Sequence, residues 1–370
     1  MRKSFIAWGG ALLLALLPAA ALAQQKNLTI DTIFGQESAV NFSGRRPRGL
    51  AWLKDGEHYL LSERGEDGKS VLLKFDAKSG ESVPLFDASK MESAFSKVPG
   101  ITADEAGRLA HRPAYQLSPA EDAVLINEAN DIFYYAFGRD EVRRLTNDPE
   151  PEVGEQFSPD GRMVSFVRSN NIFVLDLATG QERALTTDGG AKTLNGRLDW
   201  VYQEEVYGRG HFEGYWWSPD SKRIAFLHLD ESPVLPFQII DHIPYEQNVE
   251  VTYYPRSGDP NPKAKLGMAN VSGSGISWVN NYKYEPVDLL IARVTWTPDG
   301  SRLIYQAQNR QQTWLDLNSV SPKGGDPQTL IHETSKAWVE VINNPRFLKD
   351  GSFLWFSERS GWRHLYHYSA

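Results

Sequence analysis

The sequence predicts an all-β protein built as a β-propeller, on two main observations. A short turn phrase recurs along the chain: an aromatic or apolar residue, two further residues, and then Asp-Gly or a close variant. Each copy is followed by an apolar, β-branched or aromatic run, of which Met163-Val164-Ser165-Phe166-Val167 is one. Turn-and-strand units that repeat at intervals of tens of residues are typical of stacked β-architectures.

The turn phrase has the chemistry of a β-hairpin. Proline presets φ at the first turn position, aspartate hydrogen-bonds the nearby backbone, and glycine takes the left-handed conformation. The copies are Trp52-Leu53-Lys54-Asp55-Gly56, Phe157-Ser158-Pro159-Asp160-Gly161, Trp217-Ser218-Pro219-Asp220-Ser221, Trp296-Thr297-Pro298-Asp299-Gly300, Phe347-Leu348-Lys349-Asp350-Gly351 and the weaker Leu117-Ser118-Pro119-Ala120-Glu121.

The spacing of the copies sets the size of the repeat. The fourth residue of the phrase falls at positions 55, 120, 160, 220, 299 and 350, so the intervals are 65, 40, 60, 79 and 51 residues. A four-stranded propeller blade needs about 40–50 residues, so the longer intervals must carry insertions. Leu145-Thr146 and Leu185-Thr186 recur one 40-residue step apart. We expect a propeller of about seven blades; the alternative is a β-sandwich whose turns recur by coincidence.

The first residues have the pattern of a secretory signal peptide. Arg2 and Lys3 precede an apolar run from 5 to 17, and Ala21-Leu22-Ala23 offers small residues for cleavage before Gln24. We therefore expect residues 1–23 to be removed and residues 24–370 to be the propeller, in the periplasm and without a membrane anchor. The alternative is an uncleaved N-terminal anchor, although the run is short for a spanning helix.

Composition narrows the classes of function. The chain has 39 Lys+Arg against 47 Asp+Glu, and an acidic balance argues against a sequence-independent nucleic-acid binder. With no cysteine, a disulfide framework, a thiolate zinc site and a cysteine nucleophile are excluded. A pair such as His364 and His367 has metal-ligand spacing but no acidic partner in a suitable frame, so we expect no metal and no cofactor.

One segment breaks the repeat. Between residues 198 and 209, Asp199 is a plausible helix N-cap and Gly208 a plausible stop, which predicts a helix of about two turns. Glu204 and Glu205 then lie in its last turn, the unfavourable end for carboxylates. Two adjacent carboxylates suit a primary ammonium with its three N–H donors. The alternative is a solvated acidic helix end in which Arg209 is an ion-pair partner.

The same residues resemble a known family. The runs 199–206, 215–220 and 254–258, together with Asn261-Pro262-Lys263, resemble the propeller of the dipeptidyl peptidase IV group of the prolyl oligopeptidase family. The resemblance covers essentially the whole chain after the signal peptide and is most specific over 197–270. It implies an eight-bladed propeller that covers an α/β-hydrolase domain, in a serine peptidase that releases N-terminal dipeptides, typically after Pro or Ala.

The resemblance also implies roles for particular residues. The paired glutamates of the family bind the free α-ammonium of the peptide, which implies Glu204 and Glu205 here as substrate-binding residues. Family members often place an arginine near the substrate carbonyl, but the comparable stretch, about 126–137, has none, and neither Arg112 nor Arg139 sits in a matching motif. The insertion over 231–254 matches a dimer arm, which implies a homodimer.

The catalytic machinery is not in this sequence. A serine hydrolase needs a nucleophile elbow, Gly-x-Ser-x-Gly, and the nearest run, Gly273-Ser274-Gly275-Ile276-Ser277, lacks the frame. The last turn phrase is followed by two expected strands before Ala370, so we expect the final blade to be unfinished there. We expect a fragment that is inactive alone, with the Ser/Asp/His triad beyond Ala370 in a hydrolase domain of the same polypeptide. The alternative is a non-catalytic periplasmic propeller that serves as a scaffold or interaction module.

Overall fold

The computed structural model describes residues 29–35, 50–65, 67–285 and 288–370. The chain divides into two units, 1–47 and 48–370. In the first unit, the described residues form the short helix α1 (Ile30–Phe34), whose cap Thr29 accepts a hydrogen bond from the Thr32 amide at 3.2 Å. The predicted signal peptide, residues 1–23, lies outside the described residues.

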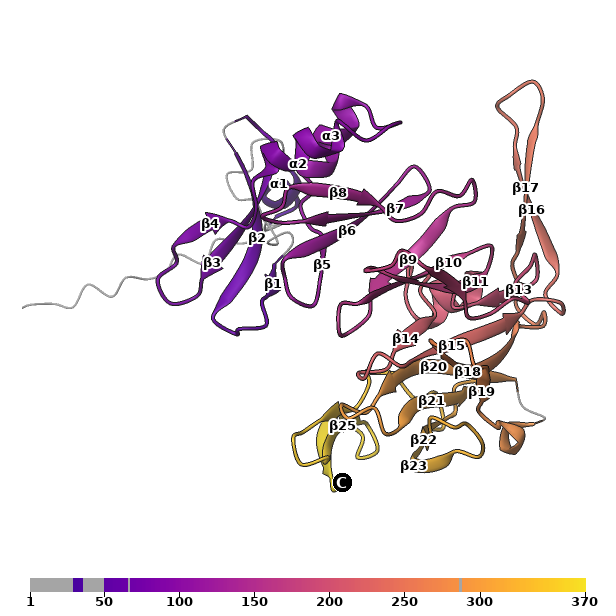
Figure 1. Ribbon diagram of the computed structural model, residues 1–370. Coiled ribbons are helices and arrows are strands. Elements are labelled where there is room, and N and C mark those ends of the chain that lie inside the picture. Colours follow the sequence, from indigo (N-terminus) through magenta and orange to yellow (C-terminus); the bar gives the residue numbers. More distant parts are fainter. Residues whose placement is uncertain (1–28, 36–49, 66, 286–287) are drawn as a thin grey trace, which may run out of the picture. The chain divides into compact units, whose positions relative to one another are not determined.

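The second unit consists mainly of a series of antiparallel sheets (Figure 1). The first sheet holds β1 (Ala51–Trp52), β2 (His58–Arg64), β3 (Ser70–Asp76) and β4 (Ser82–Pro84), and the second holds β5 (Gln116–Leu117), β6 (Ala123–Glu128), β7 (Asp131–Ala136) and β8 (Glu141–Arg144). The third holds β9 (Glu152–Phe157), β10 (Met163–Arg168), β11 (Asn171–Asp176) and β12 (Glu182–Ala184). The all-β prediction is confirmed, and consecutive strands pair within each of these sheets as in propeller blades.

Two further sheets, the fifth and the sixth, follow the fourth sheet, which is described below. The fifth sheet holds β20 (Leu289–Trp296), β21 (Leu303–Asn309), β22 (Trp314–Val320) and β23 (Gln328–Thr334), and the sixth holds β24 (Arg346–Phe347), β25 (Phe353–Ser357) and β26 (His364–Tyr368). A short 3-10 helix, η2 (Tyr282–Tyr284), precedes β20. The described residues thus contain six blade-like sheets rather than about seven, because each turn phrase begins one sheet and the long intervals are filled by insertions.

All six turn phrases lie where a hairpin joins the first strand of a sheet to the second. In each phrase the amide of the fifth residue donates to the carbonyl of the second, at 2.9 to 3.1 Å. The fifth residue has positive φ in every copy, from 58° to 85°, which glycine adopts most easily. In the first copy the Asp55 carboxylate accepts from the amides of Glu57 and His58, both at 2.9 Å. The predicted hairpin chemistry is therefore confirmed.

The 65-residue interval is lengthened by two helices that the sequence reasoning did not identify. Helices α2 (Ala88–Phe95) and α3 (Ala103–Ala110) lie between the first and second sheets in sequence. Thr102 and Glu105 form a capping box that starts α3. Met91 and Phe95 of α2 belong to the core cluster that includes Phe133 of the second sheet. The helices therefore complete the apolar core on one side of the second sheet.

The fourth sheet contains the insertion that carries the predicted site. Its strands are β13 (Thr193–Asn195), β14 (Tyr215–Trp217), β15 (Arg223–Asp230), β18 (Lys263–Asn270) and β19 (Ile276–Trp278). Both β13 and β14 pair with the same edge of β15: Asn195 lies opposite His228, and Tyr215 opposite Phe226. The first strand of this blade is thus interrupted between 195 and 215.

Two glycines close the base of the interruption. The Gly214 amide donates to the Gly196 carbonyl at 2.9 Å. Leu227 of β15 bonds to both, since its carbonyl accepts from Gly196 and its amide donates to Gly214, each at 2.9 Å. A Cβ at Gly196, where φ is 72°, would come within 2.7 Å of Ile172. The segment 197–213 is therefore a closed loop on an otherwise continuous sheet edge.

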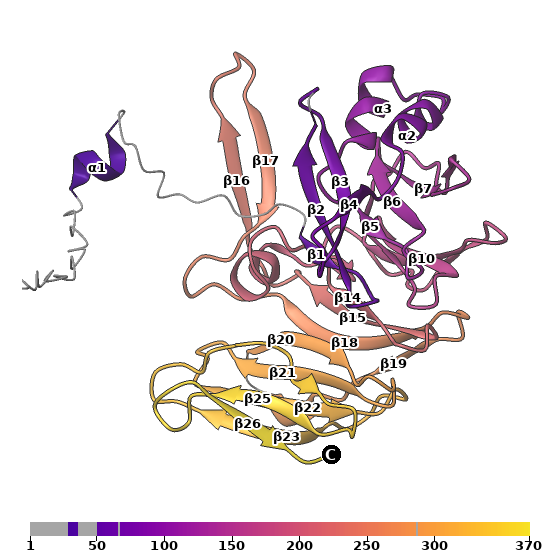
Figure 2. The ribbon, with the colours of Figure 1, turned by 90° about the vertical axis from the view of Figure 1, so that its left-hand side faces the viewer.

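A hairpin also extends from the fourth sheet. Strands β16 (Pro236–Asp241) and β17 (Asn248–Tyr253) pair only with each other and stand clear of the neighbouring sheets (Figures 1 and 2). This hairpin lies within the 79-residue interval and matches the predicted insertion over 231–254. Its strands expose apolar side chains, among them Phe237, Ile239, Ile240, Val249 and Val251.

Apolar clusters join neighbouring sheets face to face. Ile172 of the third sheet packs in one cluster with Ile224 and Phe226 of the fourth. The fourth and fifth sheets share a larger cluster, and the fifth and sixth share another, which contains Leu317 and Trp355. Because each fully buried large apolar side chain contributes about 1.5–3 kcal/mol, these contacts supply the main force that stacks the sheets.

The repeated Leu-Thr pair has the same polar role in two sheets. The Thr146 hydroxyl accepts from the Ile132 amide at 2.8 Å, and the Thr186 hydroxyl accepts from the Ile172 amide at 3.0 Å. Both threonines are buried. Each hydroxyl satisfies an amide at the start of the third strand of its sheet, which explains the 40-residue recurrence.

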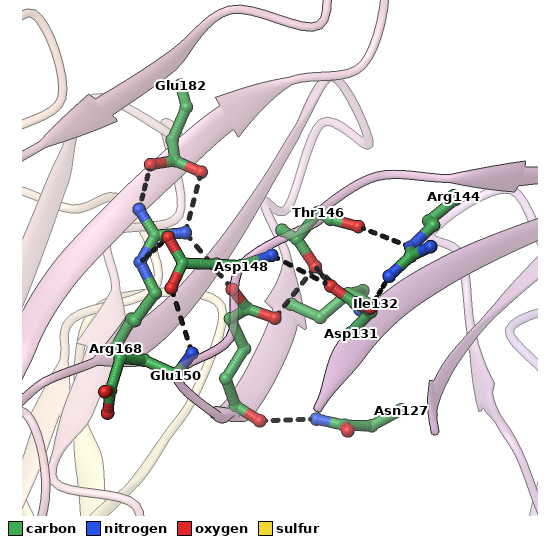
Figure 3. Close-up of polar contacts among 10 residues, drawn as sticks. Asn127, Asp131, Ile132, Arg144, Thr146, Asp148, Glu150, Arg168 and Glu182 are labelled. Carbon is green, nitrogen blue, oxygen red and sulfur yellow. Dashed lines mark hydrogen bonds and ion pairs between the residues drawn. The ribbon is translucent and has the colours of Figure 1, made fainter. Parts of the chain in front are cut away.

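The joint between the second and third sheets is charged (Figure 3). Arg168, at the end of β10, pairs with Glu152 at 3.1 Å, with Asp148 at 3.7 Å, and with Glu182 through a short bidentate contact. The Glu152 side chain is 0% exposed, and its second oxygen accepts from the Thr146 hydroxyl at 2.8 Å. Burial raises the pKa of Glu152, which the Thr146 and Arg168 hydrogen bonds oppose.

The joint between the third and fourth sheets has the same layout without the buried carboxylate. Asn171 accepts from the Thr186 hydroxyl at 3.1 Å and from the Gly189 amide at 2.8 Å. His228 occupies on β15 the position that Arg168 occupies on β10, eight residues after the aspartate of the turn phrase. Its side chain contacts that of Asn195 at 2.9 Å. One joint therefore depends on ion pairs and the other mainly on neutral hydrogen bonds.

Candidate functional site

The predicted site helix begins as the sequence indicates. The Asp199 carboxylate accepts from the amides of Val201 at 3.2 Å and Tyr202 at 3.0 Å, which makes Asp199 the N-cap. The helix then widens into η1, a π-helix over Tyr202–Val206, with the Tyr207 amide donating to the Tyr202 carbonyl at 2.8 Å. Single π-turns inside helices occur frequently at functional sites.

Two buried carboxyl groups lie at the start of this segment. Burial raises the pKa of Asp199 to about 6, and burial together with the Asp199 charge raises that of Glu231 to about 7. Lys192 and Arg197 oppose the shift at Glu231. Protonation of Asp199 and Glu231 near neutral pH therefore removes negative charge at the N-terminal end of the helix.

The base of the helix is fixed to strand β20. Tyr202 is fully buried, and its hydroxyl accepts from the Ile291 amide at 3.2 Å, while the Tyr207 hydroxyl donates to the Ile291 carbonyl at 3.3 Å. Arg293 donates to the Val206 carbonyl at 2.7 Å, and its guanidinium lies 5.2 Å from the centre of the Tyr207 ring. Contacts with Ile291 and Arg293 of β20 therefore hold the helix in place and fix the backbone that carries the two glutamates.

The two predicted glutamates are adjacent but differ in their surroundings. Glu204 is 17% exposed and accepts from Arg209, whose Nε lies 2.7 Å from Oε1 and 3.0 Å from Oε2, with a short contact from Nη2. Glu205 is exposed and has no hydrogen-bond or ion-pair partner among the residues that the structure describes. The ion pair with Arg209, which was the alternative to substrate binding, is thus formed by Glu204. Glu205 forms none with the described residues.

A cavity of about 420 Å³ opens beside Glu205. It is lined by Glu205, Val206, Arg293, Gln308, Gln312, Trp338, Val339, Glu340 and Val341. The Gln308 amide nitrogen donates to the Val339 carbonyl at 2.8 Å, and the Gln306 amide nitrogen donates to the Asn343 carbonyl at 2.9 Å. These bonds tie the loop between β23 and β24 to β21, so the wall of the cavity is fixed. The Gln308 side-chain oxygen is buried and has no partner within the described part of the chain.

Other residues considered from the sequence lie elsewhere. Arg112 donates to Glu128 at 2.9 Å and to the Asn127 carbonyl at 3.3 Å, while Arg139 is exposed. His364 and His367 are both on β26. Within the described ranges there is no group of three or more His, Cys, Asp or Glu side chains arranged to hold a metal ion. In the same ranges, no helix is long and apolar enough to cross a membrane.

The comparisons with known proteins identify the family and agree with the fold. The family model for the dipeptidyl peptidase IV (DPP IV) N-terminal region matches residues 129–370, which include the site helix and the cavity. The chain belongs to the dipeptidyl peptidase IV N-terminal region family. This membership supports the β-propeller interpretation of the six sheets.

Several relatives of this DPP IV family chain are known. It is 28% identical over 360 residues to a probable dipeptidyl-aminopeptidase B of Botryotinia fuckeliana, covering 87% of this chain and 37% of the relative. It is 29% identical over 288 residues to a probable dipeptidyl peptidase 4 of Emericella nidulans, covering 70% and 36%. The crystal structure of Porphyromonas gingivalis dipeptidyl peptidase 4 superimposes with a TM-score of 0.73 at 27% identity, covering 88% and 46%. The chain spans less than half the length of these relatives.

Proposed function

We propose that this DPP IV family chain is the peptide-recognition propeller of a secreted, periplasmic serine-type dipeptidyl peptidase. The complete protein would release dipeptides from free N-termini, after Pro or Ala. The observation that carries the proposal is the pair of carboxylates, Glu204 and Glu205, side by side on a helix that interrupts the first strand of a blade. A hydrolase domain of the same polypeptide would supply the nucleophile, and the propeller would control which peptides reach it.

The chemistry of the two glutamates fits a terminal ammonium. An ammonium offers three N–H donors, and charge-assisted hydrogen bonds to carboxylates contribute about 1.5–3 kcal/mol each. Glu205 presents toward a cavity an exposed carboxylate that has no partner among the residues placed by the structure. If the ammonium of a peptide binds there, the side chain of the peptide's first residue must lie within a few ångströms of Glu205. The cavity lined by Trp338 and Glu340 is the space available for that side chain.

The proposal is tested on the complete protein with two substrates that differ only at the N-terminus. Gly-Pro-p-nitroanilide should be hydrolysed, and its N-acetylated form should react on the order of a hundredfold more slowly or worse, because acetylation removes the charge that the carboxylates bind. Residues 24–370 alone should release no nitroaniline. Equal rates on both substrates would contradict the amine anchor. No hydrolysis by the complete protein would instead favour a non-catalytic scaffold.

The hairpin β16–β17 supports a homodimer as part of the same proposal. Ile240 and Val249 lie opposite each other in register, and both are exposed, as is Ile243 at the tip, which is 94% exposed. Apolar surface of this kind is typical of contacts between proteins. We expect the protein to have twice the monomer mass in light scattering, and Ile240→Glu with Val249→Glu to reduce it to the monomer mass. The conservative pair Ile240→Val with Val249→Ile serves as control; a monomeric parent protein would refute the dimer.

A further inference from the structure

Arg209 forms an ion pair with the carboxylate that the proposed function assigns to the substrate. Its Nε contacts both oxygens of Glu204, at 2.7 and 3.0 Å, and Nη2 contacts Oε1. The hydrogen bond to Glu204 and its charge, with that of Glu205, raise the pKa of Arg209. The guanidinium thus gives Glu204 the positive charge and N–H donors that a peptide ammonium would give.

The two partners differ sharply in exposure. The Glu204 side chain is 17% exposed, whereas that of Arg209 is 85% exposed. A carboxylate with so little access to water is costly to leave unpaired, but an arginine in water loses little when a surface ion pair breaks. Arg209 has no other hydrogen-bond or ion-pair partner among the described residues. Its side chain can therefore leave Glu204 without breaking any further contact.

The turn around Arg209 allows the side chain to move while the backbone stays in place. Gly208 and Gly210 flank it with φ of 110° and 83°, and a Cβ at either glycine would meet nothing within 4 Å. The turn backbone is nevertheless anchored, because the Gly210 amide donates to the Gln203 side chain at 2.8 Å. The guanidinium is thus held by its ion pair with Glu204 and otherwise stands in open solvent.

We propose that Arg209 is an exchangeable substitute for the substrate ammonium: it pairs with Glu204 in the free protein and is displaced when a free N-terminus binds. This inference rests on the proposed function. The arriving ammonium replaces one cation by another, so Glu204 is never left unpaired during the exchange. A blocked N-terminus carries no charge and cannot displace the guanidinium, so Arg209 is a specificity-determining residue that adds to the selection for free amines.

The test is the variant Arg209→Gln in the complete protein, assayed with Gly-Pro-p-nitroanilide. Removing a competing exposed ion pair should lower KM by about two- to fivefold with kcat unchanged, because the interaction is absent once substrate is bound. Millimolar guanidinium chloride, compared with sodium chloride at equal ionic strength, should raise KM more in the variant than in the parent protein. A matched control is Arg363→Gln, which removes an exposed arginine that contacts Glu358 at 3.1 Å and should leave KM unchanged.

Two results would overturn the inference. A raised KM in Arg209→Gln would mean that Arg209 positions Glu204 for binding, and an unchanged KM would mean that the ion pair does not compete. The lysine variant Arg209→Lys keeps the charge and should retain the parent KM within about twofold. Failure of this inference is distinguishable from failure of the proposed function. The latter would appear as insensitivity of the hydrolysis to substitution of Glu204 and Glu205.

Discussion

Replacing Glu205 by glutamine in the complete protein is expected to lower kcat/KM for Gly-Pro-p-nitroanilide by about two to three orders of magnitude, since charge-assisted bonds to the ammonium are lost. The Glu204→Gln variant should also lose activity by more than tenfold. Both substitutions keep the shape of the side chain and remove its charge. Under the proposed function, the loss should be confined to substrates with a free N-terminus, since only these carry the ammonium assigned to the two carboxylates. Initial-rate kinetics on the purified variants measures both effects.

The controls for this prediction separate charge loss from misfolding. Glu141→Gln removes an exposed carboxylate on β8 and should leave kcat/KM unchanged. Circular dichroism and the thermal midpoint should be the same for all three variants, since neither glutamate belongs to an apolar core cluster. Unchanged kcat/KM in both Glu204→Gln and Glu205→Gln would remove the amine-anchor role.

Replacing Arg168 by methionine should destabilise the propeller by about 3–5 kcal/mol, the range for breaking a buried ion pair on one side. The apolar part of the side chain is kept, but the Glu152 carboxylate, which is 0% exposed, loses its cation and keeps one hydrogen bond within the described ranges, from the hydroxyl of Thr146. Asp148 and Glu182 lose their partner as well. The midpoint of urea-induced unfolding, followed by tryptophan fluorescence, measures the change.

A second substitution distinguishes the lost charge from lost packing. Adding Glu152→Gln to Arg168→Met removes the buried charge and should recover part of the lost stability, so the two changes should not be additive. Lys78→Met, which breaks an ion pair whose side chains are 84% and 63% exposed, should cost much less. Stability loss in Arg168→Met equal to that in Lys78→Met would show that the joint does not depend on this network.

The repeat was predictable because its signal is local. Pro-Asp-Gly chemistry determines a hairpin within five residues, and the turn from Phe157 to Gly161 is an example. The spacing of the copies then distinguishes single blades from blades with insertions. Helices α2 and α3 were not predicted, since each is only eight residues long and packs against Phe133 and its neighbours in the second sheet. The described residues hold six blade-like sheets where about seven blades were expected, because the extra length of the long intervals is helix and hairpin.

The site was predictable only in part, for a related reason. Glu204 and Glu205 stand out because they are adjacent and lie in a segment that departs from the repeat. The wall of the cavity comes from Arg293, Gln308 and the loop at Trp338, which are about 90 to 130 residues further along the chain. Their spacing in sequence carries no periodic signal, and each has an ordinary role in its own strand or loop. Only the stacking of the fourth and fifth sheets brings them beside Glu205.

The hydrogen bond between Gly214 and Gly196 has a consequence for how this protein can change. Because the two glycines meet across the base of the loop, β13 and β14 already follow one line along β15, as if no residues lay between them. The blade thus obtains its register from residues outside 197–213. The two glutamates of the proposed amine site, in contrast, lie within that loop. Exposed positions of the loop, such as Glu205 and Arg209, can therefore change in charge without altering the pairing of β15, whereas Tyr202 is fixed by its place in the core.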